Sequence, residues 1–364
     1  MNNDLSQSRD VMQEIHQLVG MGQNFSDIHI EQDEAMMLKM PRGWRAASER
    51  PVSLKDMRPV LEAIDEDWED KILEGAIDRL VVLSDSRMRC NIYRAGRGDK
   101  VSISLRRLPL SPLALDKTGL PPYVKSMLET TRGIILVTGP TGSGKTTTIA
   151  SMLDFLNSTR SAHIITIEEP IEYHLARRQS IVSQKEVPTD TATFATGLRE
   201  AMRQKPDILM VGEIRDFDTA DTVLHAGESG HLVLATMHTN SAMSAISRLL
   251  AFFPPEQRAQ RAAALSSSLI GVICQSLLPT EDGEAFALAA EMLFNNNQQV
   301  APLIADPGKY HLIADFMRRK EDNMSRSLND VLSQMVNKKI ITSKDAMRAA
   351  YNRMELHDMI NSKR

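Results

Sequence analysis

The chain has 364 residues, of which 42% are hydrophobic and 25% charged, and these proportions are ordinary for globular proteins. They exclude a disordered or fibrous protein, and the length predicts two domains. The formal net charge of -4 excludes the strongly basic surface of a non-specific nucleic-acid-binding protein, so no nucleic-acid partner is expected.

The first hundred residues predict a small mixed α/β domain, assigned to 1–108. Apolar residues at helical spacing predict helices at 11–19 and 54–64. A turn is expected at 41–44. Apolar runs and alternating patterns predict strands around Ile28 and Ile30 and at 79–83, 88–93 and 101–105.

A proline-rich segment follows, RLPLSPLALDKTGLPP, with four prolines between Pro109 and Pro122. Neither a helix interior nor a central strand tolerates this spacing, so we expect an interdomain linker at 109–122. Beyond it, at 123–364, we expect a second domain.

In the second domain, apolar strand candidates alternate with helical patterns. They lie at 133–138, 162–167, 207–211 and 231–236. This order predicts a parallel sheet covered by helices. The last hundred residues read as mostly helical, with breaks at 280–283 and 307–308 and an amphipathic helical end at 342–364.

The sequence GPTGSGKT at 139–146 fits the phosphate-binding pattern G-x-x-x-x-G-K-[ST] and follows the apolar run GIILVT. Backbone N–H groups of such a turn, and the helix that starts near Lys145, surround phosphate oxygens. Lys145 would neutralise the β and γ phosphates, and Thr146 would bind Mg²⁺. The expected cofactors are therefore ATP and Mg²⁺. The predicted nucleotide-binding residues are Gly139, Pro140, Thr141, Gly142, Ser143, Gly144, Lys145, Thr146 and Thr147.

Three further polar residues follow predicted parallel strands, whose carboxyl ends form the ligand-binding edge of such sheets. Glu168 is the candidate general base, and Glu213 is expected on the Mg²⁺ shell or the attacking water. His238 would hydrogen-bond the γ phosphate. The alternative for each glutamate is a surface loop charge, and for His238 a hydrogen-bonded polar residue without a catalytic role.

Taken in order, the segments GPTGSGKT, TIEEPIEY, ILMVGEIRD and GHLVLATMHTNSA resemble the Walker A, Asp box, Walker B and His box of the secretion ATPase superfamily. Within it, SDIHIE, RMRCNIYRAGRG and SLRRLP are similar to the type IV pilus retraction ATPases of the PilT/PilU type. The resemblance covers roughly residues 10–295 and implies the catalytic roles of Glu168, Glu213 and His238. It also implies arginine fingers, for which Arg89, Arg97 and Arg106 are the nearest matches; the alternative is that these arginines only face solvent.

The same resemblance implies a PAS-like N-terminal α/β domain, a RecA-like P-loop NTPase domain with a helical C-terminal region, and a homo-hexameric ring. The implied function is an ATP-driven motor for pilus retraction and twitching motility. Its implied partners are a PilC-like platform protein of the inner membrane and a second retraction ATPase. Cys90 and Cys274 form no C-x-x-C pair and no long apolar segment is evident, so we expect a cytoplasmic protein that meets the inner membrane through partners.

Two departures from the family pattern keep alternatives open. Glu169 stands where the family has aspartate, which leaves the metal role of this box undecided, and 300–319 replaces the family's AIRNLIRE element in altered form. A related type II/IV secretion or conjugation ATPase is one alternative, although the tetracysteine loop of many such enzymes is missing. The other is an accessory nucleotide-binding subunit of the PilU type.

Overall fold

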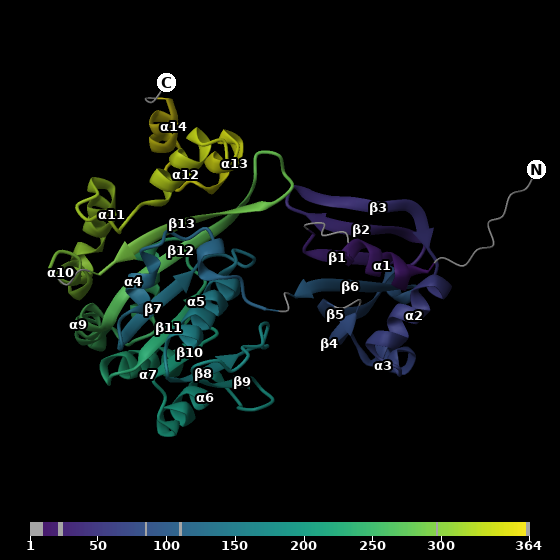
Figure 1. Ribbon diagram of the computed structural model, residues 1–364, viewed down its shortest axis with the longest axis horizontal. Helices are drawn as coiled ribbons and strands as arrows, with labels where there is room; N and C mark the ends of the chain where they lie inside the picture. Colours follow the sequence, from purple (N-terminus) through teal and green to yellow (C-terminus); the bar gives the residue numbers. More distant parts are fainter. Residues whose placement is uncertain (1–9, 21–24, 84–85, 109–110, 296–297, 362–364) are drawn as a thin grey trace, which may run out of the picture. The chain divides into compact units, whose positions relative to one another are not determined.

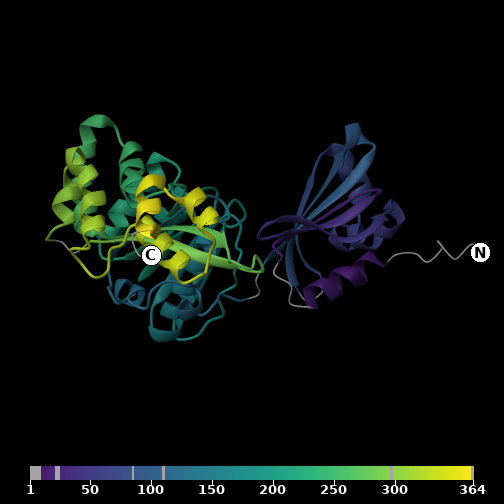
Figure 2. The ribbon, with the colours of Figure 1, turned by 90° about the horizontal axis from the view of Figure 1, so that it is seen from above.

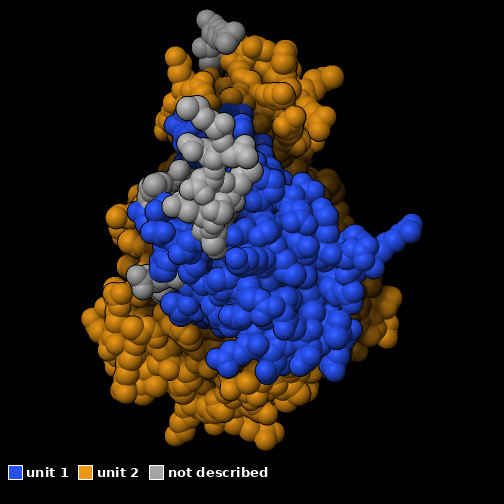
Figure 3. All heavy atoms as spheres, turned by 90° about the vertical axis from the view of Figure 1, so that its right-hand side faces the viewer, with its two compact units in different colours: residues 1–110, 282–285 blue, residues 111–281, 286–364 orange. Residues whose placement is uncertain are grey.

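The computed structural model describes residues 10–20, 25–83, 86–108, 111–295 and 298–361. The chain forms two compact units, Met1–Leu110 with Asp282–Ala285, and Ser111–Glu281 with Phe286–Arg364 (Figure 3). The described part of the predicted linker, 111–122, belongs to the second unit, where Leu115 and Leu120 are buried.

The first unit is a six-stranded antiparallel sheet with three helices (Figure 1). The strand order is β3-β2-β1-β6-β5-β4. The elements are α1 (Val11–Gly20), β1 (Asp27–Glu31), β2 (Glu34–Met40), β3 (Gly43–Val52), α2 (Leu54–Ile64), α3 (Trp68–Glu74), β4 (Ile77–Leu83), β5 (Ser86–Ala95) and β6 (Lys100–Leu108). The predicted helices and strands of this region are confirmed, whereas β2, β3 and α3 were not predicted.

Side chains on successive residues of a strand point to opposite faces, so alternate apolar residues of this sheet form one core on one face. Ile28 and Ile30 on β1, and Ile103 and Leu105 on β6, point to the same face and are buried with Met57 of α2. Helix α2 starts at a capping box, in which the Ser53 hydroxyl accepts from the Asp56 N–H and the Asp56 carboxylate accepts from the Ser53 N–H.

The second unit is a seven-stranded sheet with helices on both faces (Figures 1 and 2). Its order is β13-β12-β7-β11-β10-β8-β9, and all neighbours are parallel except β13. The strands are β7 (Gly133–Thr138), β8 (His163–Glu168), β9 (Ile181–Glu186), β10 (Ile208–Val211), β11 (Leu232–Met237), β12 (Leu269–Pro279) and β13 (Phe286–Phe294). The predicted parallel sheet is thus confirmed.

Each central strand is buried on both sides. In β7, Ile134 and Leu136 join one hydrophobic core, and Ile135 and Val137 join the other. A strand buried on both faces needs a continuous apolar run, and GIILVT supplies it. The covering helices are α4 (Val124–Leu128), α5 (Lys145–Thr159), α6 (Phe194–Ala201), α7 (Phe217–Glu228), α8 (Ala242–Ala251) and α9 (Arg258–Ser268).

The prediction that the last hundred residues are mostly helical is corrected by a pair of long strands. These residues begin in β12 and β13, which pair from Gly271↔Phe294 to Pro279↔Phe286. The helices that follow are α10 (Ala301–Ala305), α11 (Tyr310–Arg319), α12 (Leu328–Asn337), α13 (Ser343–Ala349) and α14 (Arg353–Asn361). The single helical end predicted at 342–364 is also wrong, because Ala350 leaves the helical conformation and separates α13 from α14.

Candidate nucleotide site

The predicted site residues of the second unit converge because four neighbouring strands end at one edge of the sheet. Lys145 follows β7, Glu168 is the last residue of β8, Glu213 lies just beyond β10 and His238 just beyond β11. The strands are in register there, with Thr138 beside Met237 and Ile167 beside Val211. Ligands bind at this carboxyl edge in open parallel sheets.

The phosphate loop lies between β7 and α5. It requires glycines because one position has no room for a side chain and several have positive φ angles. Gly139 has φ +143°, and a Cβ there would lie 2.3 Å from the Gln275 carbonyl oxygen and 2.5 Å from Ser143 Oγ. No side chain fits against a strand backbone at that distance. Gly142 and Gly144 also have positive φ, as a tight turn into a helix requires.

Lys145, at the start of α5, folds back over the loop. Its Nζ donates to the carbonyl oxygens of Gly139 (2.9 Å) and Pro140 (3.1 Å), and it lies 3.5 Å from His238 Nδ1. The side chain is only 9% exposed. Burial lowers the pKa of Lys145, and the nearby Glu213 carboxylate opposes that shift.

His238 connects Lys145 to Glu213. Its Nε2 lies 3.7 Å from Glu213 Oε1, and both side chains are partly exposed. Lys145, His238 and Glu213 therefore form one row of polar groups, although they come from three separate sequence segments. We call these three residues the Lys–His–Glu row.

Glu168 is the buried carboxylate of the site. It is 6% exposed and accepts hydrogen bonds from Thr166 Oγ1 (2.6 Å) and Gln184 Nε2 (3.0 Å). Burial raises the pKa of Glu168, and these hydrogen bonds partly offset the rise. The neighbouring Glu169 is more exposed and forms an ion pair with Arg215 at 3.1 Å.

The oxygen donors suit a hard cation. Thr146, Glu168, Glu169 and Glu213 all line one small hollow of about 90 Å³. The described residues include no group of three or more His, Cys, Asp or Glu side chains placed to hold a metal.

Larger hollows, of about 580 and 870 Å³, lie at the amino-terminal edge of the sheet, near His231 and Gly133. They contain no residue of the phosphate loop. The phosphate loop lies at the opposite, carboxyl edge, where backbone N–H groups at a helix start can hold phosphate without an enclosed cavity.

The candidate arginine fingers lie in the first unit, and two of them are neighbours. Arg89 on β5 pairs directly with Arg106 on β6, and Arg106 Nε contacts Asp27 Oδ1 at 2.9 Å. Arg97 lies in the β5–β6 turn at φ +61°. Along β5 the turn is roughly 20 Å from Arg89, so Arg97 and the Arg89–Arg106 pair occupy different ends of the sheet.

Three supporting residues were missed from the sequence. Gln184 on β9 holds Glu168, Gln275 on β12 donates from Nε2 to the Ser143 carbonyl at 2.8 Å, and the Tyr173 hydroxyl lies 2.8 Å from Thr147 Oγ1. Gln275 carried a usable signal, because it is a polar residue inside the apolar run LIGVICQSLL. Gln184 carried none, whereas Tyr173 is the last residue of the segment TIEEPIEY that supports the family resemblance.

A parallel sheet with a strand–phosphate loop–helix unit at its centre is the fold of a P-loop NTPase, and the comparisons with known proteins narrow the class to an ATPase. The family model for type II/IV secretion system proteins matches residues 81–353. The chain therefore belongs to the type II/IV secretion system protein family, as an ATP-binding ATPase.

Several relatives are similar over most of their length. A twitching motility protein of Neisseria gonorrhoeae is 36% identical over 73% of this chain and 70% of its own. The type IV pilus retraction ATPase PilT of Pseudomonas aeruginosa is 38% identical over 70% of this chain and 75% of its own. The type IV pilus ATPase PilU of the same organism is 36% identical over 71% and 68%.

Solved structures match the whole chain. The pilus retraction motor PilT with bound ADP has a TM-score of 0.80 and 36% identity, over 96% of this chain and 99% of that one. The ATPase DotB of Legionella pneumophila has a TM-score of 0.85 and 26% identity, over 96% and 97%. These matches confirm the predicted family and fold class.

Proposed function

We propose that this chain is a motor subunit that converts ATP hydrolysis into the retraction of a type IV pilus, and so supports twitching motility. The observation that carries the proposal is the Lys–His–Glu row beside a complete phosphate loop. The whole-chain similarity to the pilus retraction motor PilT with ADP supports the assignment to retraction.

The row and its neighbours suggest the roles of the site residues. Lys145 and the loop N–H groups hold the phosphates, and Thr146 and Glu213 hold Mg²⁺, which supplies charge neutralisation on the phosphates when bound. Glu168 acts as general base for the attacking water. His238 contacts the γ phosphate and links it to Glu213. Arg89, Arg97 and Arg106 supply the positive charge of arginine fingers.

We also propose the assembly. Six copies form a ring, which acts on a PilC-like platform protein of the inner membrane, alone or with a second retraction ATPase. Among the residues that the structure describes, no helix is long and apolar enough to cross a membrane. We propose a cytoplasmic subunit that reaches the membrane through its partners.

A second candidate is an accessory subunit of the PilU type, or a secretion ATPase. The observations that favour it are Glu169 in place of aspartate, the altered segment that holds α10 and α11, and the 36% identity to PilU. The candidates differ in whether this chain can power retraction without a second ATPase.

Turnover and motility together test the proposal. The purified chain should hydrolyse ATP without another protein, and a strain that lacks only this gene should lose or weaken twitching while still assembling pili. Complementation with Lys145→Ala should not restore twitching. An inactive purified chain, or a deletion strain with normal twitching but defective secretion, would contradict the retraction function.

A further inference from the structure

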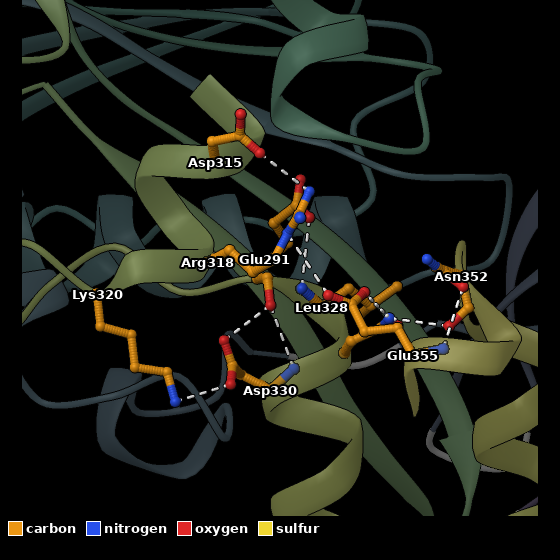
Figure 4. Close-up of polar contacts among 10 residues, drawn as sticks. Glu291, Asp315, Arg318, Lys320, Leu328, Asp330, Asn352 and Glu355 are labelled. Atoms are coloured by element: carbon orange, nitrogen blue, oxygen red, sulfur yellow. Dashed lines mark hydrogen bonds and ion pairs between the residues drawn. The ribbon is translucent and has the colours of Figure 1, made fainter. Parts of the chain in front are cut away.

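A buried carboxylate, Glu291, lies outside the site described above. It is on β13 and only 3% exposed. Its Oε1 accepts from the Ala242 N–H at 2.7 Å. Its Oε2 accepts from the Leu328 N–H at 3.4 Å, as Figure 4 shows. Burial raises the pKa of Glu291, and the two N–H groups oppose the rise.

The two donors of Glu291 each begin a helix. Ala242 is the first residue of α8 and Leu328 is the first residue of α12, both ten residues long. Helix starts carry partial positive charge, which stabilises a carboxylate. No lysine or arginine of the described chain forms an ion pair with Glu291. A buried carboxylate that lost these donors would be costly, so Glu291 fixes both helix starts in place.

One of these helix starts holds a site residue. His238 directly follows β11, and the four residues 238–241, which we call the His238 loop, lead directly into α8. The Ser241 hydroxyl caps α8 by accepting from the Ser244 N–H. Glu291 therefore anchors the far end of the loop that carries His238 in the Lys–His–Glu row.

A second contact anchors the same loop. Cys274 lies opposite Glu291 in the β12–β13 ladder, so the two side chains leave the same face of the sheet. Cys274 Sγ donates to the Thr239 carbonyl at 3.5 Å and lies 3.7 Å from the Tyr351 hydroxyl, in the segment between α13 and α14. The His238 loop is thus connected to the C-terminal helices twice, through Glu291 and through Cys274.

The C-terminal helices are themselves joined by polar contacts. Asn329 of α12 donates to Glu355 of α14 at 2.7 Å and to the Asn352 carbonyl at 3.0 Å (Figure 4). Lys320, just after α11, pairs with Asp330 of α12 at 2.8 Å. A displacement of one of these helices is therefore passed to the start of α12, where Glu291 is bound.

We propose that Glu291 is a positioning residue for ATP hydrolysis, which holds the His238 loop in place against helices α12–α14 and makes turnover depend on how these helices pack. The proposal rests on the proposed role of His238. Glu291 touches neither phosphate nor metal, so it acts on the rate only through His238.

The test uses the full chain and the substitution Glu291→Gln, which has nearly the same shape but can accept one of the two N–H groups and turns an NH₂ toward the other. A shift of about 1 Å at a group that acts on the transition state costs on the order of 100-fold in rate, so kcat should fall by 10- to 100-fold. KM for ATP should change little, because the phosphate loop is untouched.

Two further variants separate positioning from stability. Asp56→Asn alters a carboxylate that is 9% exposed and also accepts from an N–H at a helix start, but in the first unit, so kcat should stay at the wild-type value. Ala242→Pro replaces the N–H that Glu291 accepts by a ring carbon, at a first helical position whose backbone suits proline, and should reproduce the loss. It also replaces Glu291→Gln if that variant fails to fold.

The decisive test combines Glu291→Gln with His238→Ala in one double variant. If Glu291 acts through His238, then Glu291→Gln causes no further loss in the His238→Ala background. Independent, additive losses would overturn the proposal, as would wild-type kcat in folded Glu291→Gln and Ala242→Pro, or an equal loss in Asp56→Asn. Wild-type turnover in His238→Ala alone would instead overturn the role of His238 in the proposed function, and the positioning role with it.

Discussion

At the scale of single residues, Lys145 has two sets of possible partners. Its ammonium group contacts two carbonyl oxygens of its own loop, and phosphate oxygens would compete for the same donors. Burial lowers the pKa of Lys145, and an added negative charge beside it would raise that pKa again. Nucleotide binding and the charge of this side chain are thus coupled.

Lys145→Ala should abolish ATP turnover and leave the fold intact. Removing one preorganised donor to a developing charge costs on the order of 10²–10³ in kcat, and here the full charge is removed as well. Turnover and thermal unfolding of the variant should be measured beside Lys344→Ala, which removes an exposed lysine of α13. Turnover at the wild-type rate in Lys145→Ala would contradict the phosphate-loop assignment.

Glu168 predicts a pH dependence. A general base acts as the carboxylate, so turnover falls as the pH drops through its raised pKa. Gln184→Leu removes a hydrogen bond that favours the carboxylate, so the pKa rises further and the acid limb of kcat moves to higher pH. A pH–rate profile should show the shift, with the exposed Gln179→Leu as control. An unmoved limb in Gln184→Leu would mean that Glu168 is not the base.

The sequence predicted the residues that directly follow a recognisable strand, and it missed those whose role depends on pairing between distant segments. Glu168, Glu213 and His238 could be placed at one edge because parallel strands end there together. Gln184, Gln275 and Glu291 reach the site only through the pairing of β9 with β8, β12 with β7, and β13 with β12. A local pattern marks Gln275 as a polar residue in an apolar strand, but no local pattern contains the pairing of these strands.

At the scale of elements, the turn from β7 into α5 leaves different amounts of space for a side chain at its two glycines, Gly139 and Gly142. Gly139→Ala would place a Cβ against the Gln275 carbonyl of β12. Gly142→Ala meets no atom within 4 Å and has only the left-handed backbone to overcome, at φ +78°.

The two glycine variants should therefore differ. Gly142→Ala should lose about 1–2 kcal/mol of unfolding free energy, from backbone strain. Gly139→Ala should lose that amount plus about 1–3 kcal/mol from overpacking, and should bind ATP more weakly because the loop must move. Urea unfolding and ATP titration of both proteins are the measurements, and equal losses in the two would contradict this account of the turn.

The elements predicted correctly are those in which the hydrophobic pattern and the intrinsic secondary-structure propensity of the residues indicate the same structure. The run GIILVT of β7 is continuous, apolar and rich in β-branched residues, as a strand buried on both faces requires. The segment FALAAEMLF of β13 is rich in helix formers, yet it pairs with β12 along nine residues. Pairing and burial overrode propensity there, which is why the helical prediction failed.

At the scale of the whole molecule, the candidate fingers belong to the first unit and the phosphate loop to the second. A site that takes arginines from another unit or subunit gains its full charge only on assembly. Neutral replacement of a true finger lowers kcat by about 10³ or more, with a modest effect on nucleotide binding.

Arg97→Ala and Arg106→Ala test this dependence, with Arg45→Ala on β3 as an exposed control in the same sheet. We expect the loss in at least one of the two variants, and we expect turnover to elute with the assembled fraction in sizing chromatography. Arg106 is next to Arg89, whereas Arg97 lies at the other end of the sheet. The comparison of the two variants therefore also shows which end of the sheet supplies the arginine finger. Full activity in a monomeric fraction would contradict the ring-dependent mechanism.

Each unit carries one buried thiol, so the labelling rates of the two thiols can report on the two units separately. Burial raises the pKa of Cys90 to about 12 and that of Cys274 to about 11, so neither reacts with an alkylating reagent until its surroundings open. Labelling rates followed by peptide mass spectrometry therefore report local opening of the first unit at Cys90 and of the β12–α14 region at Cys274. ATP should slow labelling at Cys274 and leave Cys90 unchanged if nucleotide tightens only the second unit.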